Sequence, residues 1–382
     1  MTWKQQLQEN ISTAAQLREY RPLSAVEERQ LDNILAKYPM RVTRYYLSLV
    51  DWEHYEEDPI YRLCVPTISE NDLSGSFDTS GEGSNTKLPG LQHKYRETVL
   101  VLTTHECAMY CRHCFRKRLV GLDEKKETAI DPQAAADYIA SHPEVNKVLL
   151  SGGDYFLLST DAIRHYLELL APIPHLDFIR FGTRTPITFP SRITEDTELI
   201  DILRRYNQQK QIFVITHFNH PNEITEQSRE AVRMLREAGI GVRNQTVLLR
   251  GINDDPQILA NLLRRLVSIG AVPYYIFQCR PVTGVGTQFQ VPLLEGWRIV
   301  ESARGRVDGQ AKSFRFVMSH PTGKIELIGP VPDNKSGKDP DNRSEIEKSS
   351  ATRMIFKYNQ AKDPKDLGRI FIRGLDERQA WL

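Results

Sequence analysis

The sequence predicts an α/β fold in which a parallel β-sheet has helices between its strands. Seven short apolar runs recur at intervals of roughly 25–45 residues, and amphipathic segments such as 160–170 and 225–237 lie between them. Alternating strand and helix at this spacing indicates repeated βαβ units. Six or seven units fit an open or closed barrel better than a short sheet. The apolar runs are at 98–103, 147–150, 178–181, 212–215, 242–249, 272–277 and 314–318.

Polar, glycine or ligand-type residues follow every apolar run. In βα barrels the active site is assembled at the carboxyl ends of the strands. Glycine, asparagine and proline could serve there only as turn residues. Seven successive ends that also contain Cys, His, Arg and Lys instead favour one active-site rim. In chain order the sequences are HECAMYCRHC, SGGD, GTRTP, THFNHP, NQ with RGIND, QCR and SHPTGK.

Different patterns flank the barrel region. The first ~65 residues predict helices: Ser24 and Glu27 have capping-box spacing, and 25–38 has helical periodicity. Residues 69–90 are rich in Gly, Ser and Asp and predict a flexible surface loop, and 331–350 has a similar composition that predicts poor order. We therefore divide the chain into a helical N-terminal region (1–92), a barrel (93–330) and a C-terminal extension (331–382) without an assigned role.

The composition is ordinary for a globular protein. Hydrophobic residues are 40%, and the net charge of +1 gives no reason for bulk attraction to nucleic acid or anionic lipid. No stretch approaches the roughly 18 apolar residues of a membrane helix. The N-terminus, MTWKQQLQEN, lacks an apolar signal-peptide core. We expect a cytoplasmic protein with no nucleic-acid or membrane partner.

Three of the five cysteines form the motif Cys107-x3-Cys111-x2-Cys114, directly after the first apolar run. An odd count with this clustering is unsuited to a disulfide framework and favours a metal site in a reducing compartment. A structural zinc site needs four protein ligands. The remaining cysteines are distant, which leaves His105 or His113 to complete such a site as the alternative. A [4Fe–4S] cluster held by three cysteines leaves one iron free to bind a chelating substrate.

This motif is the signature of radical S-adenosylmethionine enzymes, and the chain resembles the lysine 2,3-aminomutase family from about residue 93 to about residue 324. CAMYCRHCFRKR, SGGD, THFNHPNEIT and NQTVLLRGIND occur in the family's order. The resemblance implies a partial (β/α)6 TIM-like barrel with a helical N-terminal extension and a C-terminal tail. It also implies three cofactors: a [4Fe–4S] cluster, S-adenosylmethionine and pyridoxal 5′-phosphate.

The reaction that the resemblance implies is an isomerisation that moves an amino group from C2 to C3 of a small amino acid. An electron donor such as flavodoxin or ferredoxin reduces the cluster. Cleavage of S-adenosylmethionine then gives a 5′-deoxyadenosyl radical, which attacks a substrate bound as a pyridoxal phosphate imine. Two alternatives stay open. One is a family member without pyridoxal phosphate that catalyses another rearrangement or acts on a protein lysine, and the other is a non-catalytic iron–sulfur protein.

The resemblance assigns site residues one at a time. Lys324 matches the lysine that forms the Schiff base with pyridoxal phosphate, although only Pro321, Thr322 and Gly323 stand where the family has a longer glycine run. A solvated turn lysine is the alternative. Cluster ligands match Cys107, Cys111 and Cys114; S-adenosylmethionine contacts match His113, Gly152, Gly153, Asp154, His217 and Gln245; phosphate contacts of the coenzyme match Lys94 and Tyr95.

The predicted substrate residues depart from the lysine enzymes. Arg116 matches the arginine that binds the substrate α-carboxylate, with a solvated basic run through Lys117 and Arg118 as the alternative. Two aspartates hold the ε-ammonium in lysine-specific relatives. The first aligns with Arg280 and the second at or near Ser319. A cation repels an ammonium, so we expect a substrate other than lysine with a second anionic group, such as glutamate. Arg280 could instead form a structural ion pair.

The family's C-terminal zinc-binding cysteines have no counterpart in this sequence. No cysteine follows Cys279. We therefore expect any homo-oligomer to form without the zinc bridge.

Overall fold

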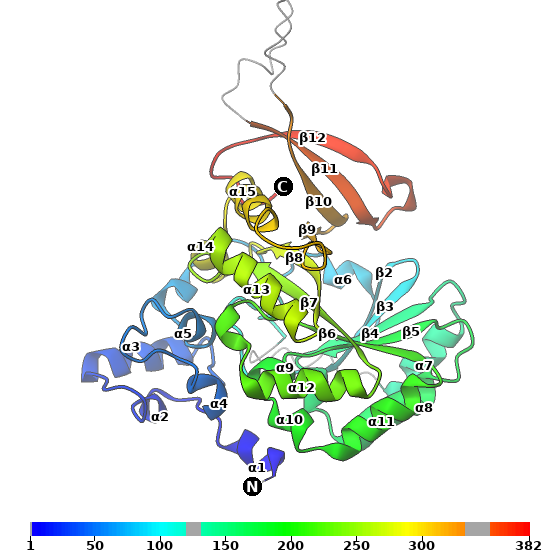
Figure 1. Ribbon diagram of the computed structural model, residues 1–382, viewed down its shortest axis with the longest axis horizontal. Helices are drawn as coiled ribbons and strands as arrows, with labels where there is room; N and C mark the ends of the chain where they lie inside the picture. The colour runs from blue at the N-terminus through cyan, green and yellow to red at the C-terminus, as the bar shows by residue number, and fades with distance from the viewer. Residues whose placement is uncertain (1, 120–130, 333–351) are drawn as a thin grey trace, which may run out of the picture.

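The computed structural model describes residues 2–119, 131–332 and 352–382. Within them, twelve strands form one sheet in sequence order. Strands β3 to β9 run parallel, and antiparallel strands flank them on both sides (Figure 1). The strands are β1 (Thr86–Leu88), β2 (Leu91–Tyr95), β3 (Thr98–Thr104), β4 (Lys147–Gly152), β5 (Phe178–Gly182), β6 (Gln211–Thr216), β7 (Gly241–Leu248), β8 (Val272–Gln278), β9 (Arg315–His320), β10 (Gly323–Pro330), β11 (Thr352–Ala361) and β12 (Ile370–Leu375).

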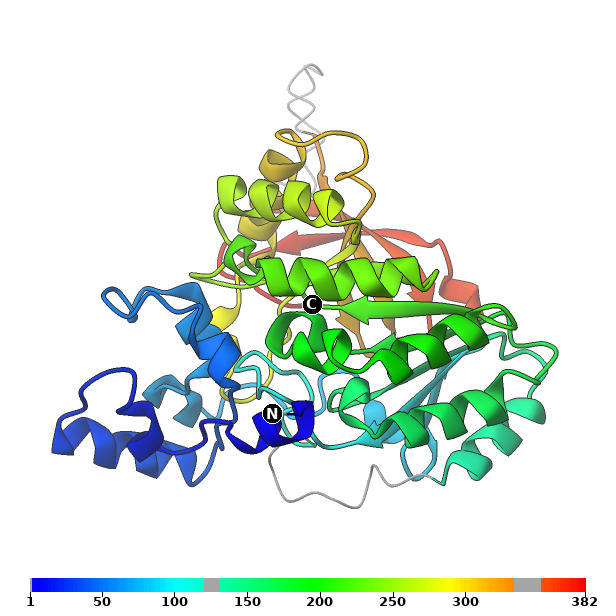
Figure 2. The same cartoon turned by 60° about the horizontal axis from the view of Figure 1, so that its bottom comes forward.

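Helices connect each parallel strand to the next, which confirms the predicted barrel of six βα units. The sheet ends, β1 and β12, are not paired with each other, so the barrel is open. Figures 1 and 2 place the green helices of these units outside the strands. Among the described residues, no helix combines the length and apolar character needed to cross a bilayer. The connecting helices are α7 (Pro132–Ala140), η3 (Tyr155–Leu157), α8 (Thr160–Leu170), α9 (Thr185–Thr188), α10 (Ser191–Thr194), α11 (Thr197–Asn207), η4 (Pro221–Glu223), α12 (Glu226–Glu237), α13 (Pro256–Ser268), α14 (Gly286–Phe289) and α15 (Leu293–Arg304).

Successive side chains of each parallel strand point alternately to the helix-packed core and to the barrel interior. In β5, Ile179 and Phe181 are fully buried and belong to the same apolar cluster as Ile163 and Leu167 of α8. Burying such a side chain stabilises the fold by ~1.5–3 kcal/mol relative to leaving it exposed. Arg180, between the two buried residues, faces the opposite side of the sheet. The interior positions are therefore free to carry polar groups.

Short helices precede the sheet and lie beside it in Figure 1. The predicted capping box is present: Glu27 N donates to Ser24 Oγ (3.2 Å), and Ser24 N donates to Glu27 Oε2 (2.8 Å). The helix that begins there ends at Leu35, earlier than the predicted residue 38. These helices are α1 (Trp3–Gln8), α2 (Ala14–Leu17), α3 (Ala25–Leu35), α4 (Arg44–Leu47) and α5 (Pro59–Cys64).

The segment 69–90 is packed against the barrel, so its prediction as a surface loop is wrong for several of its residues. It contains parts of η1 (Ile68–Asn71), all of α6 (Glu82–Asn85) and β1. Glu70 is fully buried and Glu82 is 6% exposed. Both carboxylates form ion pairs with basic residues between 112 and 118. Composition predicted a loop because these partners lie far away in the sequence.

Strands β10, β11 and β12 extend the sheet at one end of the molecule, orange to red in Figure 1. The predicted poorly ordered segment 331–350 lies outside the described residues except for its first two positions. The register of β10 and β11 places Gln360 opposite Lys324. A Cβ at Gly323 would lie 2.2 Å from the carbonyl oxygen of Gln360. Glycine at this position therefore lets β11 approach, and Gln360 reaches the wall of the central cavity.

Candidate active site

A cavity of about 320 Å³ lies at the carboxyl ends of the parallel strands. Every site residue that the sequence singles out lines it, although these residues come from eight strands or strand ends. The structure thus brings the predicted site together, while the role of each residue stays a prediction. The residues are Lys94, Tyr95, Cys107, Cys111, His113, Cys114, Arg116, Gly152, Gly153, Asp154, His217, Gln245, Arg280, Ser319 and Lys324.

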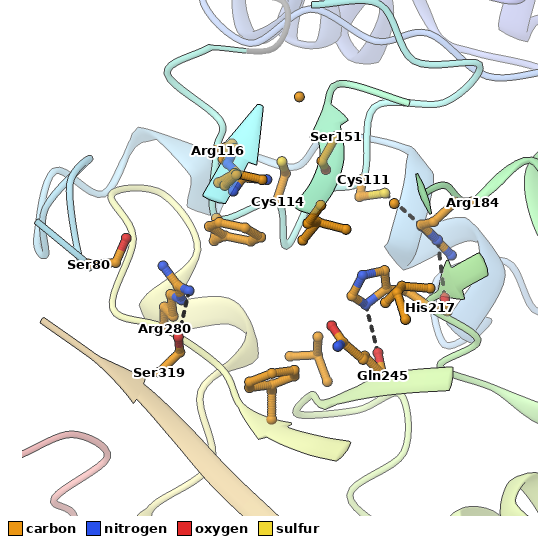
Figure 3. Close-up of a pocket in the computed structure, with 18 of the residues that line it drawn as sticks. Ser80, Cys111, Cys114, Arg116, Ser151, Arg184, His217, Gln245, Arg280 and Ser319 are labelled. Atoms are coloured by element: carbon orange, nitrogen blue, oxygen red, sulfur yellow. Dashed lines mark hydrogen bonds between the residues drawn. The ribbon is translucent and has the colours of Figure 1, made fainter. Parts of the chain in front are cut away.

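The three cysteines of the motif share one wall of this cavity, on the loop after β3. Figure 3 shows the side chains of Cys111 and Cys114 on the same side of the cavity. Burial raises the pKa of Cys107 well above its usual range and that of Cys114 to about 11. Thiols in such surroundings ionise when a cationic metal centre compensates their charge. The residue types fit a [4Fe–4S] cluster with one iron left for another ligand, although the described side chains do not converge into a group of three ligands around one point.

His113 gives independent support for a group bound beside the cysteines. Its Nε2 lies 3.4 Å from Nδ2 of Asn219, an atom that only donates, so Nε2 accepts and Nδ1 carries the proton. Burial lowers the pKa of His113 well below its usual range, which keeps the ring neutral. Nδ1 is buried without a partner in the described part of the chain. A buried N–H without an acceptor is costly, so a bound cluster or ligand atom fits this position.

The SGGD turn after β4 is held against the cysteine loop by its own backbone. Gly153 N donates to the carbonyl of Thr104 (2.6 Å), and Asp154 N donates to that of Glu106 (2.7 Å). A Cβ would lie 2.4 Å from the Thr104 oxygen at Gly152 and 2.3 Å from the Glu106 oxygen at Gly153. The two loops can meet only because both positions are glycine. The predicted contact of this turn with S-adenosylmethionine stays a prediction.

Arg184 lies within the quoted GTRTP sequence but was assigned no role by sequence reasoning. Its Nη1 donates to Sγ of Cys111 (2.6 Å) (Figure 3). Its Nη2 donates to Oε1 of Glu223 (2.6 Å), and its backbone N donates to Oδ2 of Asp154 (2.7 Å). Burial opposes its charge, but the negative charges of Cys111 and Glu223 raise the pKa of Arg184. Arg184 therefore joins Cys111, through its guanidinium, to the SGGD turn, through its backbone N–H.

His217 and Gln245 lie together on the side of the cavity away from Arg280 (Figure 3). Nδ1 of His217 donates to the carbonyl of Gln245 (2.7 Å), which leaves Nε2 as an acceptor. Burial, followed by the positive charge of Arg184, lowers the pKa of His217 to about 4. A neutral imidazole and a side-chain amide suit the hydroxyl or amino groups of a ligand.

Arg116 is nine-tenths buried, and the alternative of a solvated basic run is wrong. Its Nε donates to Oε1 of Glu82 (3.1 Å), and Nη2 of Arg118 donates to Oε2 of the same carboxylate (3.0 Å). Lys117 pairs instead with Glu70. Within the described residues the terminal nitrogens of Arg116 make no hydrogen bond, so they stay available to a ligand.

Arg280 has no carboxylate within ion-pair distance in the described residues, but Glu82 is the largest opposing charge that acts on it, so the alternative of a structural ion pair stays open. Its Nη2 donates to Oγ of Ser319 (2.9 Å), and its guanidinium carbon lies 4.2 Å from the Phe115 ring centre. Burial lowers the pKa of Arg280 to about 10, against the opposing charge of Glu82. Arg280 is therefore still a cation at neutral pH.

Lys324 lies at the start of β10, and its side chain borders the cavity rather than a solvated turn. Its Nζ is 4.6 Å from the ring centre of Tyr275 and makes no hydrogen bond or ion pair in the described residues. Burial, and then the positive charges of Arg180 and Arg280, lower the pKa of Lys324 to about 7. An amine that is partly unprotonated at neutral pH is suited to covalent attachment of an aldehyde.

Lys94 is engaged by the protein rather than free. Its Nζ donates to the carbonyls of His320 (2.7 Å) and Ser80 (3.4 Å). Burial, followed by the positive charge of Arg280, lowers the pKa of Lys94 to about 8. The protonated amine has three N–H donors, so these two carbonyl bonds leave one donor for a phosphate contact.

Comparison with known proteins identifies the protein family to which the chain belongs. Residues 101–263 match the Radical SAM superfamily. The chain is 37% identical over 357 residues to a putative L-lysine 2,3-aminomutase of Aquifex aeolicus, covering 93% of this chain and 90% of that protein. It is 40% identical over 323 residues to L-lysine 2,3-aminomutase of Acetoanaerobium sticklandii (84% and 76% covered). It is also 36% identical over 322 residues to glutamate 2,3-aminomutase of Clostridioides difficile (84% and 74% covered). Because the similarity extends over most of each protein and includes the cysteine motif, the chain belongs to the lysine 2,3-aminomutase family of radical S-adenosylmethionine enzymes.

Proposed function

We propose that the protein is a pyridoxal phosphate-dependent 2,3-aminomutase whose substrate is an amino acid with a second carboxylate, such as glutamate. Enzymes of this family use a [4Fe–4S] cluster and S-adenosylmethionine, which supply radical initiation, and pyridoxal phosphate, which holds the migrating amino group. The observation that carries the substrate class is Arg280, a cation without a carboxylate partner among the described residues that shares the cavity with the cysteines and Lys324.

Two arginines are placed to hold two carboxylates of one small molecule. The guanidinium carbons of Arg116 and Arg280 lie 4.5 Å and 4.2 Å from the centre of the same Phe115 ring. Both therefore lie close together on one side of the cavity, as Figure 3 shows. Arginine binds a carboxylate through two parallel N–H donors, and a buried cation without an anion is costly. A substrate ammonium in this region would instead face like charge.

The other residues of the cavity position and protect the reacting groups. The neutral Lys324 amine favours attachment of the coenzyme aldehyde without prior loss of a proton. Ser319 holds the Arg280 guanidinium in place through its hydroxyl. Because Lys324 pairs with Ser319 across β9 and β10, substrate selection and coenzyme attachment share one rigid hairpin.

The comparisons support the reaction class more strongly than the substrate. Identity to the L-lysine enzymes is as high as identity to the glutamate enzyme. Overall identity does not discriminate between them because selection between two amino acids depends on the few residues that contact the differing group. The arginine at 280 is therefore more informative than the ranking of relatives.

Anaerobic reconstitution with iron, sulfide, pyridoxal phosphate and S-adenosylmethionine tests the proposal against a panel of deuterated amino acids. We expect deuterium from glutamate, and none from lysine, in 5′-deoxyadenosine. Transfer from lysine alone would overturn the substrate class. Absence of transfer from every free amino acid, with the cluster intact, would favour a protein lysine or a non-catalytic role.

Arg280→Met and its control separate substrate selection from folding. A hydrogen bond to a charged group contributes ~1.5–3 kcal/mol, so kcat/KM for glutamate should fall about 10- to 150-fold. Arg243→Met is the control, because Arg243 also packs on interior aromatic rings but does not line the cavity. Equal losses in both variants would contradict a substrate contact by Arg280.

A further inference from the structure

Arg180 is a cavity residue that none of the assigned roles explains. It stands in the middle of β5, between two fully buried apolar residues, and lines the same cavity as Lys324. Its Nε is buried without a partner. Within the described residues its guanidinium forms no hydrogen bond or ion pair. The guanidinium carbon lies 5.7 Å from the centre of the Phe178 ring, a cation–π contact.

Another arginine of this chain shows how the fold treats a buried guanidinium. Arg192 is fully buried, and its Nε donates to the carbonyl of Phe156 (2.6 Å) while its Nη1 pairs with Asp196 (2.7 Å). Buried polar groups are satisfied in this way in most proteins, because an unpaired buried charge costs several kcal/mol. Arg180 is only partly buried and borders the cavity, but it has no equivalent acceptors, so its geometry fits a partner bound in the cavity.

The surroundings of Arg180 indicate the charge of that partner. Arg243 and Lys324 are its basic neighbours in the barrel interior, and none of the three forms an ion pair in the described residues. Among neighbouring charges, Arg180 has the largest effect on the amine of Lys324. Several uncompensated cations close together favour a multiply charged anion over a single carboxylate.

We propose that Arg180 binds the phosphate monoester of pyridoxal phosphate when the coenzyme aldehyde faces Lys324. This rests on the proposed function. A phosphate monoester carries about −1.5 to −2 charges at neutral pH and accepts two parallel bonds from a guanidinium. Lys94, the phosphate contact that the family resemblance implies, is already bonded to two carbonyls. Arg116 and Arg280 lie together on the Phe115 ring, where they are available to the substrate.

Paired titrations with pyridoxal phosphate and pyridoxal, which lacks the phosphate, test this assignment. The full-length protein is titrated without S-adenosylmethionine, and the imine absorbance band reports binding. Arg180→Gln should weaken pyridoxal phosphate binding about 10- to 150-fold more than pyridoxal binding, the range expected for a charged hydrogen bond. The accompanying rise in the pKa of Lys324 affects imine formation with both aldehydes alike, whereas the phosphate contact is lost only for the coenzyme. Arg180→Lys should recover part of the loss. Inorganic phosphate should compete with pyridoxal phosphate in the wild type and less in Arg180→Gln.

The controls distinguish the contact from a structural role. Arg243→Gln, which removes a neighbouring interior cation that does not line the cavity, should retain the preference for pyridoxal phosphate over pyridoxal. Equal weakening of both aldehydes in Arg180→Gln, or unchanged pyridoxal phosphate binding in that variant, overturns the assignment. A wild-type protein that forms no imine with pyridoxal phosphate overturns the proposed coenzyme instead, so the two failures are distinguishable.

Discussion

Covalent attachment of pyridoxal phosphate to Lys324 should be efficient at neutral pH. The amine of an ordinary lysine has a pKa near 10.4, whereas burial and nearby positive charges lower the pKa of Lys324 to about 7. At pH 7.5 about three-quarters of the Lys324 amines are therefore unprotonated, against about 0.1% for an ordinary lysine. The concentration of the reactive amine is higher by a factor of several hundred.

The sign of the pH dependence follows from the direction of this pKa shift. The neutral, nucleophilic form of Lys324 is present above about pH 7 and is lost as the pH falls through that value. Burial is the largest cause, and the charges of Arg180 and Arg280 come next. Arg280→Gln removes one repelling charge, so it should move the midpoint of attachment to higher pH.

Stopped-flow measurement of the imine band across acidic to mildly alkaline pH gives this midpoint. Borohydride reduction and peptide mass spectrometry then identify the modified lysine, with Lys324→Ala as the control. A midpoint near that of a solvated lysine would refute the argument from burial. A modified peptide that contains Lys94 in place of Lys324 would refute the assignment itself.

Other substitutions test the cluster loop and its supports. Cys114→Ala should abolish cluster assembly, so iron content after reconstitution falls to background. Gly153→Ala places a Cβ 2.3 Å from the Glu106 carbonyl, and the forced separation of the two loops should weaken S-adenosylmethionine binding in a calorimetric titration. Arg184→Gln removes a cationic hydrogen bond to a cluster thiolate, so the midpoint potential in an EPR redox titration should become more negative, and a rise would contradict the contact. Glu82→Gln leaves two buried arginines without their carboxylate and should lower the free energy of unfolding by ~3–5 kcal/mol in denaturant titrations.

The parallel strands were predictable because each is packed between helices and the barrel interior. Their runs of buried apolar residues coincide with β3 to β9 within a few residues. The flanking antiparallel strands escaped prediction. In β12, only Leu375 is buried, so its conformation depends on pairing with β11 rather than on an apolar pattern. Pairing between segments distant in sequence leaves no local signal.

The site was predictable where a motif fixes both residue type and spacing. Three residues that the structure brings into the site network, Glu82, Arg180 and Arg184, were missed for different reasons. Glu82 lies in a segment with loop composition, and its partners are more than thirty residues away. Arg184 belongs to the strand-end sequence GTRTP, but its hydrogen bond to Cys111 depends on how the cysteine loop folds. Arg180 could have been found from the sequence. An arginine inside an otherwise apolar strand indicates a side chain that faces the barrel interior and binds a polar group.

The fold distinguishes the cations that support the site from those left for ligands. Glu70 and Glu82, both from the segment with loop composition, neutralise basic residues that follow the cysteine motif. In the described residues no carboxylate forms an ion pair with Arg180 or Arg280, although both line the cavity and the charge of Glu82 acts on Arg280. A chain of net charge +1 thereby acquires a strongly cationic cavity. Ligands that bring a phosphate and an additional carboxylate complete the charge balance that the protein leaves open, whereas a substrate with a second ammonium increases the imbalance.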